Sequence, residues 1–206
     1  MAQSNQEIES KFYVQDLATI EKRLNELGAT CIVPRKFEYN LRFDNHQKSF
    51  QRQHKVIRLR KFDDIRLTFK GAGEQIGTAL SRTEIELVVN DFDQAQKFLE
   101  GLGFTVSAVY EKYRAMYRLL TTIITLDQLP YGDFVEIEAE NPEIISDIAI
   151  KLGLNPNAAI PASYQGLFEQ VKSKLNLPIK NLSFWEFQNF KITVTDLGVE
   201  PADNLS

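Results

Sequence analysis

Two glutamates and a lysine occupy alternate positions near the start of the chain, as Glu7, Glu9 and Lys11. On a β-strand, alternate residues share one face, so these three would lie together while Ile8 and Phe12 lie on the opposite face. Paired carboxylates bind hard divalent cations, and an ammonium beside them suits phosphate oxygens. Taken alone, this pattern is more typical of a half-exposed strand with a charged solvent face.

The same alternation of apolar and charged residues recurs along most of the chain. The apolar positions are rich in β-branched and aromatic residues, which predicts β-strands. The polar faces of these predicted strands consist of Glu38, Asn40, Arg42 and Asp44; Arg58 and Arg60; Arg66, Thr68 and Lys70; Arg82, Glu84 and Glu86; Lys112, Arg114 and Arg118; Thr125 and Asp127; and Glu136 and Glu138.

The signs of these charges are segregated by strand, which favours a functional interior over a solvated sheet face. A solvated face would also alternate, but it ordinarily carries Thr, Ser, Gln and scattered Lys. Here some strands are purely basic on their polar face and others are mainly acidic. If the sheet closes, carboxylates in the lumen can hold a metal ion and basic side chains can hold a polyanion.

Four segments carry helix signals. Apolar stripes predict two helices that pack on the outer face of the sheet. The N-cap candidate is Asp16 for the first helix and Asp91 or Asp93 for the second, and a glycine ends each helix. The stripes are Leu17, Ile20, Leu24 and Leu27, and Phe92, Ala95, Phe98 and Leu102. Two later helices are expected from Pro142 to Leu152 and from Ser163 to Leu175.

Composition limits the classes of protein that this chain can be. Its 206 residues fit one sizeable domain. The net charge of −4 argues against a broad nucleic-acid interface. One cysteine, Cys31, permits no internal disulfide and no cysteine metal cluster. Because no run approaches the ~20 apolar residues that span a bilayer, we expect a soluble, cytoplasmic protein without a membrane partner.

In their order along the chain, these motifs resemble those of the CYTH family, the triphosphate tunnel enzymes. Members include class IV adenylyl cyclases, thiamine triphosphatases and inorganic tripolyphosphatases. The resemblance covers roughly residues 6 to 170, and its specificity lies in the ordered series rather than in any one motif. The matching segments are Glu7, Glu9 and Lys11; Arg58-Leu59-Arg60; Lys70-Gly71; Arg82, Glu84 and Glu86; Lys112 and Arg114; Asp127; residues 132–138; and Ser163-Tyr164.

One segment departs from the family pattern. Where members commonly carry an Asp-x-Tyr-Phe-Asp-like strand, this chain has Asn40-Leu41-Arg42-Phe43-Asp44. Arg42 therefore replaces an aromatic hydroxyl that some members use near the attacking water.

The resemblance implies an α+β fold: a closed antiparallel barrel of eight strands, the triphosphate tunnel, with a charged lumen and flanking helices. We expect residues 1–175 to form this domain and residues 176–206 to form an aromatic-rich extension that packs on the barrel and is frayed from Pro201. Phe184, Trp185, Phe187 and Phe190 give the extension its aromatic character.

The expected activity is metal-dependent cleavage of a triphosphate, a small-molecule substrate. All-oxygen ligands favour Mg²⁺ or Mn²⁺. We predict metal binding by Glu7, Glu9, Asp127, Glu136 and Glu138, and substrate binding by Lys11, Arg58, Arg60, Lys70, Arg82, Lys112 and Arg114. The predicted catalytic residues are Lys11, Lys70, Glu84 and Glu86; the two glutamates would complete a second metal site or orient the attacking water.

Three functions stay open at this stage. Hydrolysis of tripolyphosphate, thiamine triphosphate or a nucleoside triphosphate is preferred, because it requires no purine pocket. The alternative is a class IV adenylyl cyclase, which converts ATP to cyclic AMP and pyrophosphate. A non-catalytic polyphosphate-binding module is a second alternative, although anion binding alone gains nothing from buried carboxylates. The oligomeric state, including a homodimer, is also open.

Overall fold

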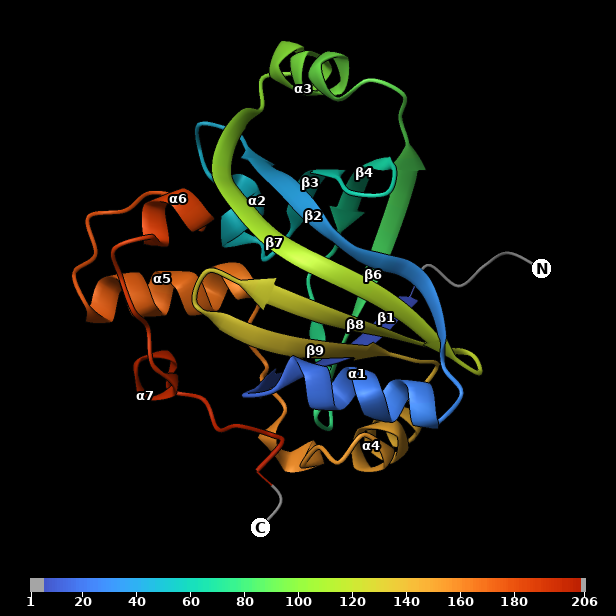
Figure 1. Ribbon diagram of the computed structural model, residues 1–206. Coiled ribbons are helices and arrows are strands. Elements are labelled where there is room, and N and C mark those ends of the chain that lie inside the picture. The colour runs from blue at the N-terminus through green and yellow to red at the C-terminus, as the bar shows by residue number, and fades with distance from the viewer. Residues whose placement is uncertain (1–5, 205–206) are drawn as a thin grey trace.

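The protein forms a closed antiparallel β-barrel with helices around it, as a computed structural model describes for residues 6–204 (Figure 1). Eight strands close the barrel in the order β1-β9-β8-β7-β2-β3-β4-β6, and β6 pairs back onto β1. The predicted fold is therefore confirmed. The strands are β1 (Gln6–Val14), β2 (Thr30–Asp44), β3 (Val56–Lys61), β4 (Ile65–Lys70), β5 (Glu74–Ile76), β6 (Ala79–Val88), β7 (Thr105–Leu119), β8 (Thr122–Leu129) and β9 (Gly132–Glu138).

Strand register brings charged residues opposite one another. Glu9 faces Glu138 and Lys11 faces Glu136 across β1 and β9, while Arg58 on β3 lies beside Arg42 on β2. Since the side-chain period of a strand is two, the charged set of each strand points inward and the apolar set points outward.

Helices cover the apolar outer face at the lower end of the barrel. Ile20 and Leu24 of α1 are fully buried in one core with Ile137 of β9 and Leu152, which follows α4. The helices are α1 (Leu17–Glu26), α2 (Ser49–Arg52), α3 (Phe92–Gly101), α4 (Pro142–Lys151), α5 (Tyr164–Lys174), α6 (Phe184–Phe187), α7 (Val194–Leu197) and the 3₁₀-helix η1 (Pro156–Ala158). None of the helices in residues 6–204 has the length and apolar character needed to cross a bilayer.

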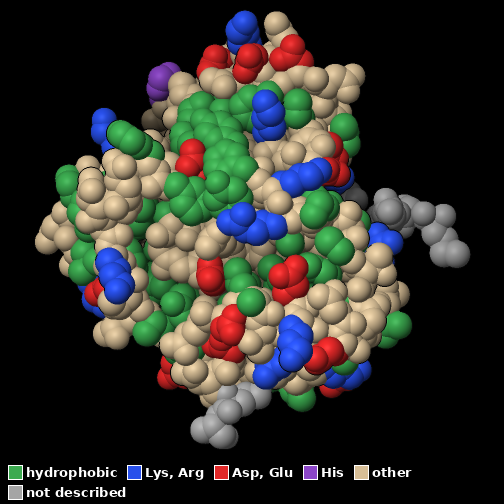
Figure 2. All heavy atoms as spheres, viewed as in Figure 1, with side chains coloured by type: hydrophobic (Ala, Val, Ile, Leu, Met, Phe, Trp, Pro, Cys, Tyr) green, Lys and Arg blue, Asp and Glu red, His purple; other side chains and the backbone are tan. Residues whose placement is uncertain are grey.

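Helix α3 contacts the barrel less than its apolar stripe predicts. It is capped by Asp91 and joins β6 to β7 at the upper end of the barrel (Figure 1). Its buried residue is Leu99, whereas Phe98 and Leu102 are 64% and 60% exposed. The prediction that these two side chains are core is wrong, because α3 packs only its inner edge on the strands. Figure 2 shows apolar side chains open to solvent below α3, along β2 and β7.

The C-terminal segment is bound to the barrel by backbone hydrogen bonds. The Leu182 amide donates to the Val109 carbonyl at 3.1 Å, and the Ala202 amide donates to the Tyr13 carbonyl at 2.8 Å. Both Leu182 and Ala202 are fully buried. Pro201 also bridges to Tyr13, so the chain is held against β1 at residues 201 and 202; residues 205 and 206 lie outside the described part, and fraying of the end stays a prediction. A boundary at residue 175 stays a prediction.

Leu182→Ala should test how much the C-terminal segment stabilises the barrel. The Leu182 side chain lies at 0% exposure in the core that contains α5 and Phe187, so truncation should lower the free energy of unfolding by about 2–5 kcal/mol. Trp185→Ala is the matched control, because Trp185 is 75% exposed and its loss should cost less than about 0.5 kcal/mol. Urea unfolding measures both; equal effects would show that the segment does not contribute to the core.

Candidate active site

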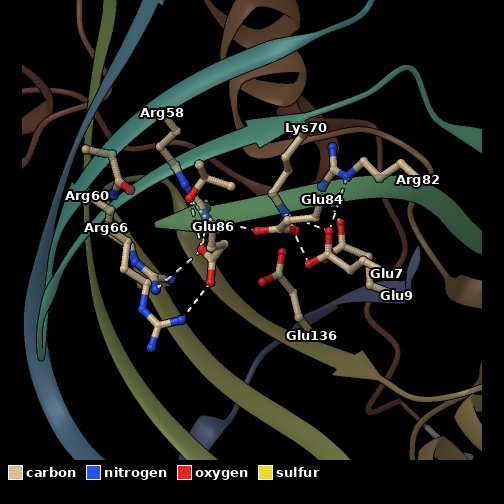
Figure 3. A network of polar contacts seen from close by, with 12 residues as sticks. Glu7, Glu9, Arg58, Arg60, Arg66, Lys70, Arg82, Glu84, Glu86 and Glu136 are labelled. Carbon is tan, nitrogen blue, oxygen red and sulfur yellow. Dashed lines mark hydrogen bonds and ion pairs between the residues drawn. The ribbon is translucent and has the colours of Figure 1, made fainter. Parts of the chain in front are cut away.

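A cavity of about 850 Å³ lies inside the barrel, and half of the residues that line it are charged. It contains every predicted site residue except Asp127. Its basic residues are Lys11, Arg42, Arg58, Arg60, Arg66, Lys70, Arg82, Lys112 and Arg114, and its acidic residues are Glu7, Glu9, Asp63, Asp64, Glu84, Glu86, Glu136 and Glu138. Figure 3 shows the carboxylates of β1 and Glu84 on one side and the guanidinium groups of β3 on the other.

Carboxylates from β1 and β9 gather at one end of the cavity. Lys70 Nζ lies 2.7 Å from Glu7 Oε2, and Arg82 donates to Glu9 Oε1 at 2.8 Å. Within residues 6–204, the Glu138 side chain makes no hydrogen bond or ion pair. Although Glu138 lies at the exposed end of β9, loss of water and the neighbouring charges of Glu7 and Glu9 raise its pKa to about 7. Among the described residues, no basic side chain therefore holds this carboxyl group.

Glu7 and Glu84 behave as an acid pair. Burial raises the pKa of Glu84, and its hydrogen bond with Glu7 raises it further. For Glu7, burial is outweighed by that hydrogen bond and by Lys70 and Arg82, so the pKa of Glu7 is lowered. Lys70 contacts both carboxylates, at 2.7 Å and 2.6 Å. The two carboxyl groups therefore titrate as a pair, in which the pKa of Glu84 is raised and that of Glu7 is lowered.

Guanidinium groups gather at the other end, around Glu86. Glu86 accepts hydrogen bonds from Arg66 at 2.7 Å and from the Thr68 hydroxyl at 2.9 Å, and it lies 3.5 Å from Arg58. The Nε atoms of Arg58 and Arg60 are buried without a hydrogen-bond partner in residues 6–204. Unsatisfied buried donors are costly, so this end of the cavity is suited to an anion.

Asp127 lies behind the cavity and anchors basic side chains of the neighbouring strand. Its side chain has no exposure and does not line the cavity. Its two oxygens accept hydrogen bonds from Lys112 at 3.0 Å, from Arg114 at 2.6 and 2.5 Å, and from the Tyr164 hydroxyl at 2.8 Å. These donors already satisfy both oxygens, so Asp127 fits a metal ion less well than the carboxylates of the cavity, and its role as a ligand stays a prediction.

Glu38 is a second buried anchor, and the sequence motifs missed it. It is fully buried, with Lys112 at 3.5 Å and Arg114 at 3.8 Å. Burial opposes its charge, but Lys112, Arg114, Arg60 and Arg58 together lower its pKa to about 2. The alternation of Glu38 with apolar neighbours was the signal for its inward direction.

Two tyrosines and Arg66 are further cavity residues that the motifs did not assign. The Tyr164 ring lies 4.3 Å from Lys11 Nζ and 5.0 Å from Lys112 Nζ, so it separates two ammonium groups. Tyr110 lines the cavity and hydrogen bonds with Arg58. Tyr164 begins a helix, so strand alternation could not indicate that it faces the lumen.

The acidic end has the chemistry of a metal site, although its oxygens are held by basic side chains. No group of three or more acidic, histidine or cysteine residues in 6–204 is already assembled around an ion position. Lys70 and Arg82 instead contact Glu7 and Glu9. The Glu138 carboxyl, which lies near Glu7 and Glu9, fits a divalent cation with oxygen ligands. Glu136 fits less well, because Lys11 at 2.6 Å and Arg114 at 2.5 Å occupy its carboxylate.

Known proteins share both this sequence pattern and this barrel. A candidate adenylate cyclase from Methanocaldococcus jannaschii is 27% identical over 145 residues, which are 69% of this chain and 79% of that protein. A candidate adenylate cyclase structure from Vibrio parahaemolyticus has a TM-score of 0.73 at 20% identity, covering 81% of this chain and 99% of the other.

A third similar protein is a candidate adenylyl cyclase from Hippeastrum that is described as having a dominant triphosphatase activity. Its structure has a TM-score of 0.60 at 18% identity and covers 79% of this chain and 95% of that one. The family model described as the CYTH domain matches residues 5–164. Because that match spans most of the chain and includes β1 to β9, this protein belongs to the CYTH family.

Proposed function

We propose that this protein is a metal-dependent triphosphatase that hydrolyses its substrate inside the barrel. The observation that carries this proposal is the single cavity in which nine basic side chains lie beside a separate cluster of carboxylates. A triphosphate carries several negative charges, so its burial requires dense positive compensation. The carboxylates have no use in binding an anion alone, but they are suited to the cation that accompanies a triphosphate.

Exchange of ionic partners is the central step of substrate binding in this proposal. In the free protein, Lys70 and Arg82 neutralise Glu7 and Glu9. Glu7, Glu9 and Glu138 would hold Mg²⁺ or Mn²⁺, and Lys70 and Arg82 would then be released to bind phosphate oxygens. The bound ion would supply charge neutralisation and activation of a water molecule.

The remaining basic side chains orient the triphosphate. Lys11, Arg58, Arg60, Lys112 and Arg114 line the cavity, and fixed carboxylates hold several of them in place. Since phosphoryl transfer depends mainly on positioning and charge neutralisation, this rigid arrangement is a sufficient catalytic device.

The two predicted catalytic glutamates take different roles. Glu84 lies with Glu7 and Lys70 at the carboxylate end, where it can orient the attacking water. Glu86 is held by Arg66 and Thr68. We therefore assign Glu86 to positioning the guanidinium groups.

Adenylyl cyclisation is the second candidate, and the names of the Methanocaldococcus and Vibrio proteins favour it. Two features support hydrolysis. The ring of Tyr164 already packs against Lys11 and Lys112, so it is not free to stack on a purine. The Hippeastrum protein combines the name of a cyclase with a dominant triphosphatase activity, so on this fold a cyclase name does not determine the reaction.

Product analysis separates the two reactions. Purified protein with Mg²⁺ or Mn²⁺ should release orthophosphate from tripolyphosphate or thiamine triphosphate, and Ca²⁺ should support turnover poorly because it prefers larger, more flexible coordination. Ion chromatography measures the products. Stoichiometric cyclic AMP and pyrophosphate from ATP, with no phosphate release from any other triphosphate, would identify a cyclase and contradict hydrolysis.

Glu7→Gln and Glu138→Gln should each lower kcat about 100-fold or more while the protein stays folded, because each removes a charge from the proposed metal site. Turnover measured across a Mg²⁺ or Mn²⁺ titration tests this. Glu140→Gln is the control, since Glu140 is exposed just beyond β9 and should retain activity. Near-normal rates at saturating metal in both site variants would remove these residues from the metal site.

Arg60→Ala should raise KM about 10- to 100-fold without destabilising the free protein. A hydrogen bond between charged groups contributes about 1.5–3 kcal/mol to binding. In the free protein, burial and the nearby Arg58 and Arg114 lower the pKa of Arg60, so its removal should leave stability unchanged or raise it by about 0.5–2 kcal/mol.

The control for this prediction is Lys61→Ala, which removes the exposed basic residue next to Arg60 on β3. Kinetics and urea unfolding should be measured on the same preparations. Substantial unfolding of Arg60→Ala, with normal activity in the folded fraction, would instead make Arg60 structural.

A further inference from the structure

Arg42 differs from all other basic residues around the cavity. The eight others each lie 3.9 Å or less from a carboxylate oxygen. The Arg42 side chain makes no hydrogen bond or ion pair within residues 6–204. It lines the cavity from β2, directly beside Arg58 on β3. The free protein therefore supplies no counter-ion for this one guanidinium group.

The acidic residue closest in sequence to Arg42 is already committed elsewhere. Asp44 accepts hydrogen bonds from the backbone amides of Asn45, Phe50 and Gln51 at 2.8, 3.1 and 2.9 Å. Its carboxylate thereby fixes the turn into α2 and is not available for an ion pair with Arg42.

Like charges surround Arg42 instead. Burial lowers the pKa of Arg42, and the charges of Arg82 and Arg58 lower it further. Tyr110 and Asp44 raise this pKa, but they offset only part of the decrease. Neighbouring cations on paired strands destabilise a sheet, and Arg42 is half-buried, so water screens its charge only in part. An anionic ligand that reaches between Arg42 and Arg58 would relieve this repulsion.

We propose that Arg42, with Arg58 and Tyr110, forms an additional anion subsite beside the triphosphate site, and that it binds the fourth phosphoryl group of a linear polyphosphate. This inference rests on the proposed function, because it assumes that three phosphates occupy the other basic side chains. Seven basic side chains of the cavity remain when Arg42 and Arg58 are set aside, so a triphosphate does not require Arg42. The cavity of about 850 Å³ also has the volume of a site for a drug-sized ligand.

The predicted substrate is thus a polyphosphate of four or more phosphates, in preference to tripolyphosphate. The Arg42 guanidinium can neutralise a further phosphate and bind two of its oxygens at once, which a neutral side chain cannot do.

The test compares tripolyphosphate with tetrapolyphosphate in wild-type protein, Arg42→Gln and Arg42→Tyr. Calorimetry with Ca²⁺, which should support turnover poorly, measures the Kd of both ligands in the presence of a cation, and kcat/KM in Mg²⁺ measures both as substrates. Each substitution should weaken tetrapolyphosphate binding about 10- to 100-fold, and the loss should exceed that for tripolyphosphate by at least about tenfold. Arg35→Gln, which alters an exposed arginine on the same strand, should change neither Kd.

The outcomes separate this inference from the proposed function. Equal losses for the two ligands would place Arg42 in the triphosphate site and overturn the subsite. Unchanged binding of both ligands, or no measurable binding of tetrapolyphosphate to the wild type, would also overturn the subsite. An Arg42-dependent preference for tetrapolyphosphate without hydrolysis of any substrate would support the subsite and contradict the triphosphatase. Hydrolysis of a triphosphate without an Arg42-dependent preference for tetrapolyphosphate would support the triphosphatase and contradict the subsite.

Discussion

Pairing between carboxylates and basic side chains determines how the interior of this barrel is built. Small barrels are usually filled by apolar side chains, whereas here the strands turn ions inward. Burying one ion without a partner costs several kcal/mol, and some strands carry one sign alone: β3 supplies Arg58 and Arg60, while β9 supplies Glu136 and Glu138. Balance is reached only when the barrel closes, so closure and charge neutralisation depend on each other.

The ion pairs fall into two groups that differ in what could replace them. Asp127 and Glu38 have no exposure and hold Lys112 and Arg114 from beneath, and neither carboxylate lines the cavity. The pairs around Glu7 line the cavity itself, where a cation and an anion arriving together can exchange with them. The buried pairs keep basic side chains in place, and the cavity pairs can exchange with a ligand. The site is therefore both preorganised and able to bind a highly charged substrate.

The barrel and most of its lining could be predicted from sequence because strand alternation fixes the direction of a side chain. Alternation does not show whether an inward-facing side chain reaches the cavity or is covered by its neighbours. Asp127 therefore resembled a cavity ligand, although Tyr164 and Arg114 cover it. Nor does alternation extend to a helix start, which is why Tyr164 was missed. The stripe on α3 predicted burial of Phe98, but an apolar stripe contains no information on whether a facing surface exists.

The basic side chains of the cavity indicate a phosphate substrate, but they do not distinguish hydrolysis from cyclisation. Hydrolysis and cyclisation act on the same kind of triphosphate and differ in the attacking oxygen, which comes from water in one and from a ribose in the other. Basic side chains such as Arg58 and Arg60 serve both equally. The choice must depend on groups that admit or exclude the rest of the substrate. In this chain those groups include Arg42, whose unneutralised charge favours a further anion over a sugar and a base.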